Sequence, residues 1–148
     1  MELRLYQKSA VDAVYNHLRK KDNNPCVVIP TGGGKTPVLA TIIRDAIKLW
    51  NGRVLVLTHV KELLLQAEDK LRIIAGDIEI GIYSAGLNRR EPHKQCVLAG
   101  IQSAYKIANT LGHFDLVIVD EAHLIPPDGN GMYQQLLGDL KKINPLLR

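Results

Sequence analysis

The chain has 148 residues, 46% of them hydrophobic and 23% charged, with a formal net charge of +4. This length supports one substantial core and is too short for two ordinary domains, so we expect a single domain over residues 1–148. The positive balance suits a polyanionic partner, but acidic and basic residues are interspersed, so charge alone does not identify nucleic acid. No apolar run approaches the ~20 residues needed to cross a bilayer, and the opening residues do not resemble a signal peptide. We therefore expect a cytoplasmic protein without a membrane partner.

The two cysteines, Cys26 and Cys96, each lie in a short apolar run. Neither has the CxxC spacing of a zinc site. We therefore expect two buried, reduced thiols rather than a disulfide or a metal centre.

The first elements alternate between helix and strand. Apolar residues recur at helical spacing between residues 8 and 19, which predicts a helix that the polar residues 22–25 end. Residues 26–29, Cys-Val-Val-Ile, are too few and too β-branched for a buried helix, and predict a central parallel strand ending at Pro30. A second helix follows the glycines and extends to Trp50.

The same alternation continues to the end of the chain. Further strands are predicted over residues 54–57, 78–83, 95–99 and 116–119, with helices over 60–71, from about 101, and over 133–143, the last preceded by a loop at 128–131. Strands that alternate with helices predict a doubly wound α/β domain, with a mostly parallel sheet and helices on both faces.

A glycine-rich segment joins the predicted strand at 26–29 to the following helix. Residues 30–36 read Pro-Thr-Gly-Gly-Gly-Lys-Thr, the context and composition of a phosphate-binding loop. The backbone N–H groups of such a loop and the positive end of its helix bind a triphosphate. Lys35 then reaches the β- and γ-phosphates, and the Thr36 hydroxyl binds Mg²⁺. The predicted nucleotide-binding residues here are Thr31, Gly32, Gly33, Gly34, Lys35 and Thr36.

Two residues depart from the full phosphate-loop pattern. Ile29 replaces its first glycine, and Pro37 removes an N–H group that would otherwise be available to the α-phosphate, which weakens nucleotide affinity. The alternative is a glycine-rich turn with an incidental Lys-Thr pair.

Two adjacent acids, Asp120 and Glu121, follow the predicted strand at 116–119. Ligands bind at the carboxyl ends of strands in open α/β sheets. Asp120 is placed to hold Mg²⁺ through water, and Glu121 to orient and deprotonate an attacking water. Such a pair alone is more often a solvated turn, but together with the phosphate loop it indicates nucleotide hydrolysis.

These motifs resemble the first motor domain of the superfamily 2 helicases, which carries an adenine-reading glutamine, a PTGxGKT loop and a DExH box, here Asp120-Glu121-Ala122-His123. Residues 54–63 and 84–90 are similar to the RadD-type bacterial DNA-repair helicases. The resemblance covers residues 3 to about 125. It implies a RecA-like P-loop domain that uses ATP and Mg²⁺, within an ATP-dependent DNA helicase or translocase of DNA repair.

The resemblance also implies roles for single residues near the nucleotide. Gln7 would read the amino edge of adenine, and Arg4 would lie against the base. Without the resemblance, Gln7 is an exposed residue at a helix start. His123 would couple the nucleotide state to the nucleic-acid-binding face.

Contacts with a nucleic-acid backbone are implied for Thr58, His59, Lys61, Gln102 and Ser103. Hydroxyls, amides and a lysine are what phosphate contacts require, and such contacts carry little sequence preference. Thr58 and His59 equally fit a strand-end turn, and Ser103 an ordinary helix start. Arg89 and Arg90 either extend this path or solvate a loop, and we favour solvation.

The family sandwiches ATP between two similar domains, the second of which supplies arginine fingers. We expect that second motor domain to be absent from this chain, and the isolated chain to hydrolyse ATP very slowly. An RNA helicase, a restriction-type translocase subunit and a non-motor, nucleotide-dependent regulatory module are the alternatives. A small P-loop kinase would need an acceptor site and lid arginines, which we do not find.

Overall fold

The computed structural model describes residues 2–29, 34–125 and 131–148. Within them the strands are β1 (Val54–Thr58), β2 (Ile80–Ser84), β3 (Arg89–Arg90), β4 (Cys96–Gly100) and β5 (Leu116–Val119). The helices are α1 (Leu5–Lys20), α2 (Lys35–Lys48), α3 (Lys61–Ala75), α4 (Ile101–Ala104), α5 (Ala108–Leu111), the 3₁₀ turn η1 (Ala122–Leu124) and α6 (Met132–Ile143).

The strands form one sheet in the order β3-β2-β4-β1-β5. β1 pairs in parallel with β4 and β5, β4 pairs in parallel with β2, and the two-residue β3 is antiparallel to β2. In this register Thr58 lies opposite Gly100 and Leu57 opposite Val119. The segments that follow these three strands therefore leave the sheet at the same edge, as predicted for an α/β domain.

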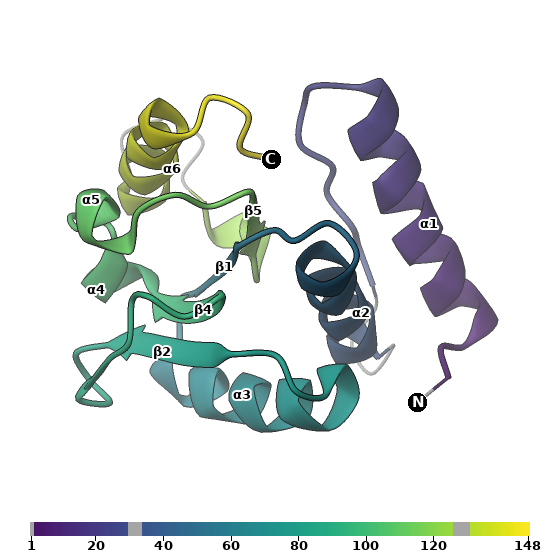
Figure 1. Cartoon of the computed structure of the whole chain (residues 1–148), viewed down its shortest axis with the longest axis horizontal. Helices are drawn as coiled ribbons and strands as arrows, with labels where there is room; N and C mark the ends of the chain where they lie inside the picture. Colours follow the sequence, from purple (N-terminus) through teal and green to yellow (C-terminus); the bar gives the residue numbers. More distant parts are fainter. Residues whose placement is uncertain (1, 30–33, 126–130) are drawn as a thin grey trace.

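Helices cover both faces of the sheet, as the alternating pattern predicted (Figure 1). Val54 and Val56 of β1 pack with α2 and α3, whereas Leu55 and Leu57 pack with α4, α5 and α6. All five residues of β1 are buried, because successive side chains point to opposite faces and each face is covered. α1 packs on α2 through a separate cluster that includes Val11, on the side away from α6 in Figure 1.

The prediction of a central strand at residues 26–29 is wrong for this structure. The segment forms neither a strand nor a helix, and Val28 is 86% exposed. Ile29 packs against the α1–α2 cluster. Within the described residues β5 therefore has a strand partner on one side only, while the Val117 N–H donates to the carbonyl of Arg148. An apolar, β-branched run favours a strand, but a strand exists only where it finds a ladder partner.

The cysteine prediction is confirmed at one position and wrong at the other. Cys96 is fully buried in β4, and burial raises the pKa of its thiol to about 12. Cys26 is exposed because its segment lies outside the sheet. Both thiols are free.

Three short elements lacked a sequence signal. β3, α5 and η1 have two to four residues each, too few to show a periodicity. α2 ends at Lys48 rather than Trp50, and the Trp50 ring lies edge-on to Tyr15 with centroids 5.0 Å apart. Positions 128–130 of the predicted loop lie outside the described residues.

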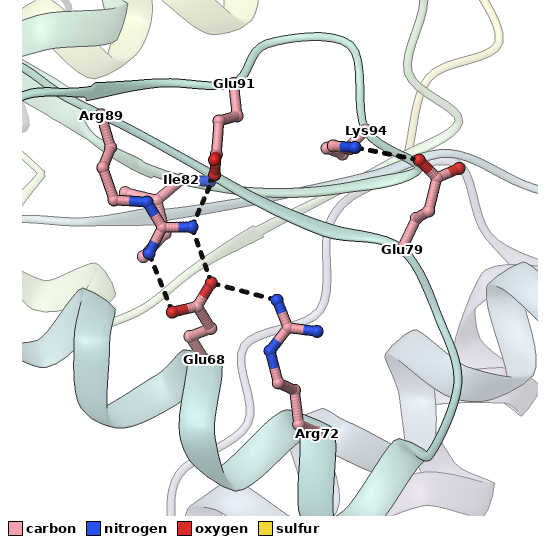
Figure 2. A network of polar contacts seen from close by, with 7 residues as sticks. All are labelled: Glu68, Arg72, Glu79, Ile82, Arg89, Glu91 and Lys94. Carbon is pink, nitrogen blue, oxygen red and sulfur yellow. Dashed lines mark hydrogen bonds and ion pairs between the residues drawn. The ribbon is translucent and has the colours of Figure 1, made fainter.

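Arg89 lies in an ion-pair network that joins β3 to α3 (Figure 2). Its guanidinium donates to both carboxylate oxygens of Glu68 at 2.9 Å and to Glu91 Oε1 at 2.6 Å. Arg72 donates to the same Glu68 at 3.3 Å. The preference for a solvated loop is therefore wrong for Arg89, whereas Arg90 is exposed.

Candidate nucleotide and nucleic-acid sites

Lys35 and the acid pair meet at the carboxyl edge of the sheet. Lys35 is the first residue of α2, and Asp120 directly follows β5. The Lys35 ammonium donates to Asp120 Oδ1 and lies 3.4 Å from Glu121 Oε1. The two motifs that the sequence analysis paired, 85 residues apart, thus form one site.

The Lys35 ammonium of this site faces two carboxylates, those of Asp120 and Glu121. Burial lowers the pKa of Lys35, but the hydrogen bond and charge of Asp120, and then those of Glu121, outweigh it and raise the pKa above its usual value. The side chains of Lys35 and Glu121 are each 43% exposed, and that of Asp120 is 17% exposed. An incoming phosphate can therefore reach the ammonium and compete with the carboxylates for it.

Glu121 has a backbone conformation that is uncommon for a residue with a side chain. Its φ of 55° and ψ of 52° lie in the left-handed region, at a cost of about 1–2 kcal/mol. Its N–H donates to Asp120 Oδ1 at 3.0 Å, and the Asp120 N–H donates to the Leu57 carbonyl at 2.9 Å. His123 Nδ1 lies 3.3 Å from Glu121 Oε2. This turn carries the Glu121 carboxylate out of the strand direction and beside Lys35.

Gln7 connects α1 to the end of the phosphate loop. It is only 3% exposed, so its assignment as an exposed helix-start residue is wrong. Its Nε2 donates to the Gly34 carbonyl at 3.0 Å, and its Oε1 accepts from the Arg4 N–H at 2.8 Å. An amide group has one further donor and acceptor position, and these match the N7 and N6 groups of adenine. Arg4 is exposed beside it, and the predicted residues Thr31, Gly32 and Gly33 lie outside the described residues.

A magnesium ion fits the donors at this edge if it arrives with a nucleotide. Thr36, half-buried in the first turn of α2, follows Lys35 directly and offers a hydroxyl, and Asp120 offers a carboxylate. Mg²⁺ commonly takes one or two protein oxygens and completes its shell with water and substrate phosphates. In the described part of the chain, no group of three or more His, Cys, Asp or Glu residues is placed to hold a metal without such help.

The predicted nucleic-acid residues lie at the same edge of the sheet but differ in accessibility. His59, Lys61 and Gln102 are exposed. Thr58 is 4% exposed, and its hydroxyl accepts from the Val60 N–H at 3.5 Å. Thr58 is therefore placed to shape the turn after β1 rather than to present its side chain to a ligand.

The segment after β2 lies beside these residues, although the sequence analysis gave it no role at the nucleic-acid site. The half-buried Ser103 accepts a hydrogen bond from the Ala85 N–H at 2.9 Å. The Lys61 side chain lies against Gly86, where an added Cβ would be 3.0 Å from Lys61 Cδ. The one sequence signal for this close approach is the small size of residues 85 and 86, which lets another segment come near the backbone.

No helix among the described residues is both long and apolar enough to cross a membrane.

A mostly parallel, helix-covered sheet with a phosphate-loop lysine against a strand-end acid pair defines a RecA-like motor domain of the superfamily 2 helicase class. The chain belongs to the family described as "Type III restriction enzyme, res subunit", whose model matches residues 1–147.

Two curated relatives are similar over most of this chain. The putative ATP-dependent helicase IRC3 of Saccharomyces cerevisiae is 30% identical over 129 residues, 82% of this chain and 19% of that protein. The DNA 3'-5' translocase XPB2 of Sulfurisphaera tokodaii is 31% identical over 137 residues, 92% of this chain and 28% of that protein. The chain thus spans less than a third of either relative.

Solved structures share the fold at lower identity. The UvsW helicase from Bacteriophage T4 matches with a TM-score of 0.77 and 19% identity, over 99% of this chain and 51% of that one. A nuclease-deletion mutant of the Type ISP restriction-modification enzyme LlaGI, in complex with a DNA substrate mimic, matches with a TM-score of 0.62 and 21% identity, over 83% and 15%.

Proposed function

We propose that this chain is the ATP-binding half of an ATP-dependent DNA helicase or translocase that couples hydrolysis to movement along DNA. The observation that carries the proposal is the Lys35 ammonium held between Asp120 and Glu121. Lys35 exchanges these carboxylates for the β- and γ-phosphates, and Glu121 then orients and deprotonates the attacking water. Mg²⁺, held by Thr36 and by Asp120 through water, would neutralise charge on the phosphates.

DNA is the partner that the surface and the relatives favour. His59, Lys61, Gln102 and Ser103 follow adjacent strands at one edge, and Lys61 supplies a positive charge there. One relative is named as a DNA translocase, and one structural match holds a DNA substrate mimic. Contacts of this kind bind the backbone without reading sequence, as a motor requires. His123, beside Glu121, would link the nucleotide site to this surface.

We propose that the chain acts together with a second motor domain. Both curated relatives are more than three times as long as the part this chain matches. An arginine finger from a second domain contributes a factor of ~10³–10⁵ in kcat at related phosphoryl-transfer sites. The chain alone is therefore expected to bind ATP weakly and to turn it over slowly. We also propose that the protein acts in DNA repair, as RadD-type helicases do, and that it acts in the cytoplasm.

A restriction-type translocase subunit is the second candidate, and the family match and the LlaGI fold favour it. It predicts ATPase activity driven by duplex DNA and coupled to a methyltransferase or nuclease partner. An RNA helicase predicts stimulation by RNA instead, and a non-motor regulator predicts ATP binding that no nucleic acid affects.

Nucleotide binding by Lys35→Ala tests the site itself. The substitution should abolish binding of a fluorescent ATP analogue, because it removes charge-assisted contacts worth ~1.5–3 kcal/mol each. Lys48→Ala is the matched control, since Lys48 lies in the same helix and pairs with the exposed Asp77. Equal affinity of Lys35→Ala and Lys48→Ala would refute the assignment.

The motor itself is tested on a longer protein that contains this domain. We expect single-stranded DNA to stimulate its ATPase strongly, and Glu121→Gln to retain ATP binding while hydrolysis stops. ATPase activity that is indifferent to DNA and RNA would favour the regulatory module. Normal turnover by Glu121→Gln would refute Glu121 as the base.

A further inference from the structure

Tyr133, in the first turn of α6, has a hydroxyl that the fold buries without satisfying. The residue is 3% exposed, and within the described part of the chain its hydroxyl finds no hydrogen-bond partner. Buried hydroxyl groups normally have a partner, so an unsatisfied one needs an explanation. A phenylalanine would fill the same volume without leaving a polar atom unpaired.

The position of Tyr133 connects it to the acid pair. Its ring belongs to the cluster that contains Val119, immediately before Asp120, and Ile125, just after the following turn. Tyr133 therefore shares one hydrophobic cluster with the residues at both ends of the segment that carries Asp120 and Glu121. Burial, and then the negative charge of Asp120, raise the pKa of Tyr133. The phenol therefore keeps its proton at neutral pH and remains a donor.

The contacts of Asp120 show when that donor would be needed. The Lys35 ammonium holds Asp120 Oδ1, and the Glu121 N–H donates to the same oxygen. Lys35 must leave this carboxylate to bind a phosphate. Asp120 then loses its cationic partner at the stage when its orientation toward a hydrated metal ion matters.

We propose that Tyr133 is a positioning residue for Asp120, and that its hydroxyl donates a hydrogen bond to the Asp120 carboxylate once Lys35 has moved to the nucleotide phosphates. The inference rests on the proposed function, because it requires Asp120 to serve a nucleotide-bound Mg²⁺. Outer-shell hydrogen bonds of this kind orient ligating carboxylates, and their loss weakens metal affinity by ~10- to 100-fold. Tyr133 touches no reacting atom in this scheme and acts only through Asp120.

The test compares wild type with Tyr133→Phe in binding a fluorescent ATP analogue, titrated with Mg²⁺ and also measured in EDTA. Both proteins should bind equally in EDTA, whereas Tyr133→Phe should need about tenfold more Mg²⁺ for half-maximal tightening. Thermal melting of the free protein should be unchanged or higher in Tyr133→Phe, because no bond is lost in that state. If the hydroxyl had a purely structural role, Tyr133→Phe would lower the stability of the protein and leave the Mg²⁺ dependence of binding unchanged.

Tyr105→Phe is the matched control, because Tyr105 is half-buried in the same cluster and its contact with the Lys106 ammonium needs only the ring. Its Mg²⁺ dependence should equal that of wild type. An unshifted Mg²⁺ dependence in Tyr133→Phe, or an equal shift in Tyr105→Phe, would overturn the inference and leave the proposed function intact. Failure of wild type to bind the analogue with or without Mg²⁺ would overturn both.

Discussion

Gln7 Nε2 donates to the Gly34 carbonyl at 3.0 Å, so the residue predicted to read adenine also fastens the end of the phosphate loop to α1. A Cβ at Gly34 would lie 2.3 Å from that nitrogen, which leaves room for glycine alone. Base recognition and loop geometry therefore share one side chain. The two roles can be separated by experiment.

Gln7→Ala should lower the affinity for ATP about tenfold more than the affinity for GTP, a difference equivalent to ~1.4 kcal/mol. Loss of base reading removes discrimination between the nucleotides, whereas loss of loop support alone weakens both equally. Competition against a fluorescent nucleotide measures the ratio of affinities. Asn16→Ala, at an exposed position of the same helix, is the control. A preserved ATP-to-GTP ratio would remove the adenine-reading role.

Gly34→Ala should destabilise the fold and weaken nucleotide binding. The φ of +79° costs a residue with a side chain about 1–2 kcal/mol, and the clash with Gln7 adds to it. In a Gln7→Ala background the steric part should disappear, so the double variant should lose less stability than the sum of the single variants. Urea denaturation provides these values. Gly138→Ala in α6 is the control, because an added Cβ there meets nothing within 4 Å, and it should stabilise the fold by about 0.5–1 kcal/mol. If the losses of stability in Gly34→Ala and Gln7→Ala simply add in the double variant, the steric contact between the two residues is contradicted.

Most of the fold could be predicted because the buried faces of helices and strands require apolar residues at regular spacings in the sequence. The run at residues 54–57 became β1 and the helical pattern at 133–143 became α6, each within a residue or two. Residues 26–29 carry an equally apolar pattern but lie outside the sheet. Local composition measures the tendency to form a strand, whereas a ladder also depends on which edge is available in the tertiary structure.

The site was predictable where chemistry dictates residue type. The meeting of Lys35 with Asp120 and Glu121 follows from a loop and a strand end that share one edge. The contact of Lys61 with Gly86 has no comparable signal, because it depends on how two loops pack. The unsatisfied hydroxyl of Tyr133 was hidden for another reason: in a sequence it reads as one more apolar residue of a buried helix face.

Arg89→Ala should destabilise the protein by about 2–3 kcal/mol. The substitution leaves the buried Glu68, 8% exposed, with Arg72 as its remaining guanidinium partner, and frees β3 from α3. Arg90→Ala, at the exposed neighbouring position, should change stability by less than about 0.5 kcal/mol. Urea denaturation distinguishes the two. Equal effects would mean that the network in Figure 2 contributes nothing beyond surface charge.

The same network predicts a loss of stability in acid. Its hydrogen bond from Arg89 lowers the pKa of Glu68 below the usual 4.5, and a backbone hydrogen bond from Ile82 chiefly lowers that of Glu91. A depressed carboxyl pKa stabilises the fold fully above pH 4.5, and the stabilisation is lost as pH falls through the folded-state pKa. Melting temperatures should therefore fall more steeply between about pH 5 and pH 3 in wild type than in Glu68→Gln. Glu62→Gln, at an exposed position of the same helix, is the control and should lose melting temperature with falling pH as steeply as wild type. If Glu68→Gln shows the same steep fall as wild type, the network is not the cause of the acid sensitivity.

Lys61→Ala should weaken binding of single-stranded DNA and reduce the dependence of log K on log salt concentration by about 0.7, the value for one phosphate contact. The reason is the position of Lys61 at the start of α3 against Gly86, beside the exposed His59 and Gln102. Lys70→Ala removes an equal charge from the far part of the same helix and should change neither quantity beyond the small effect of net charge. Fluorescence anisotropy with labelled oligonucleotides at several salt concentrations gives both values. Both variants could instead bind DNA with the same affinity and the same salt dependence. DNA would then not bind at the carboxyl edge of the sheet, and the net positive charge of the chain would attract DNA only through long-range electrostatics.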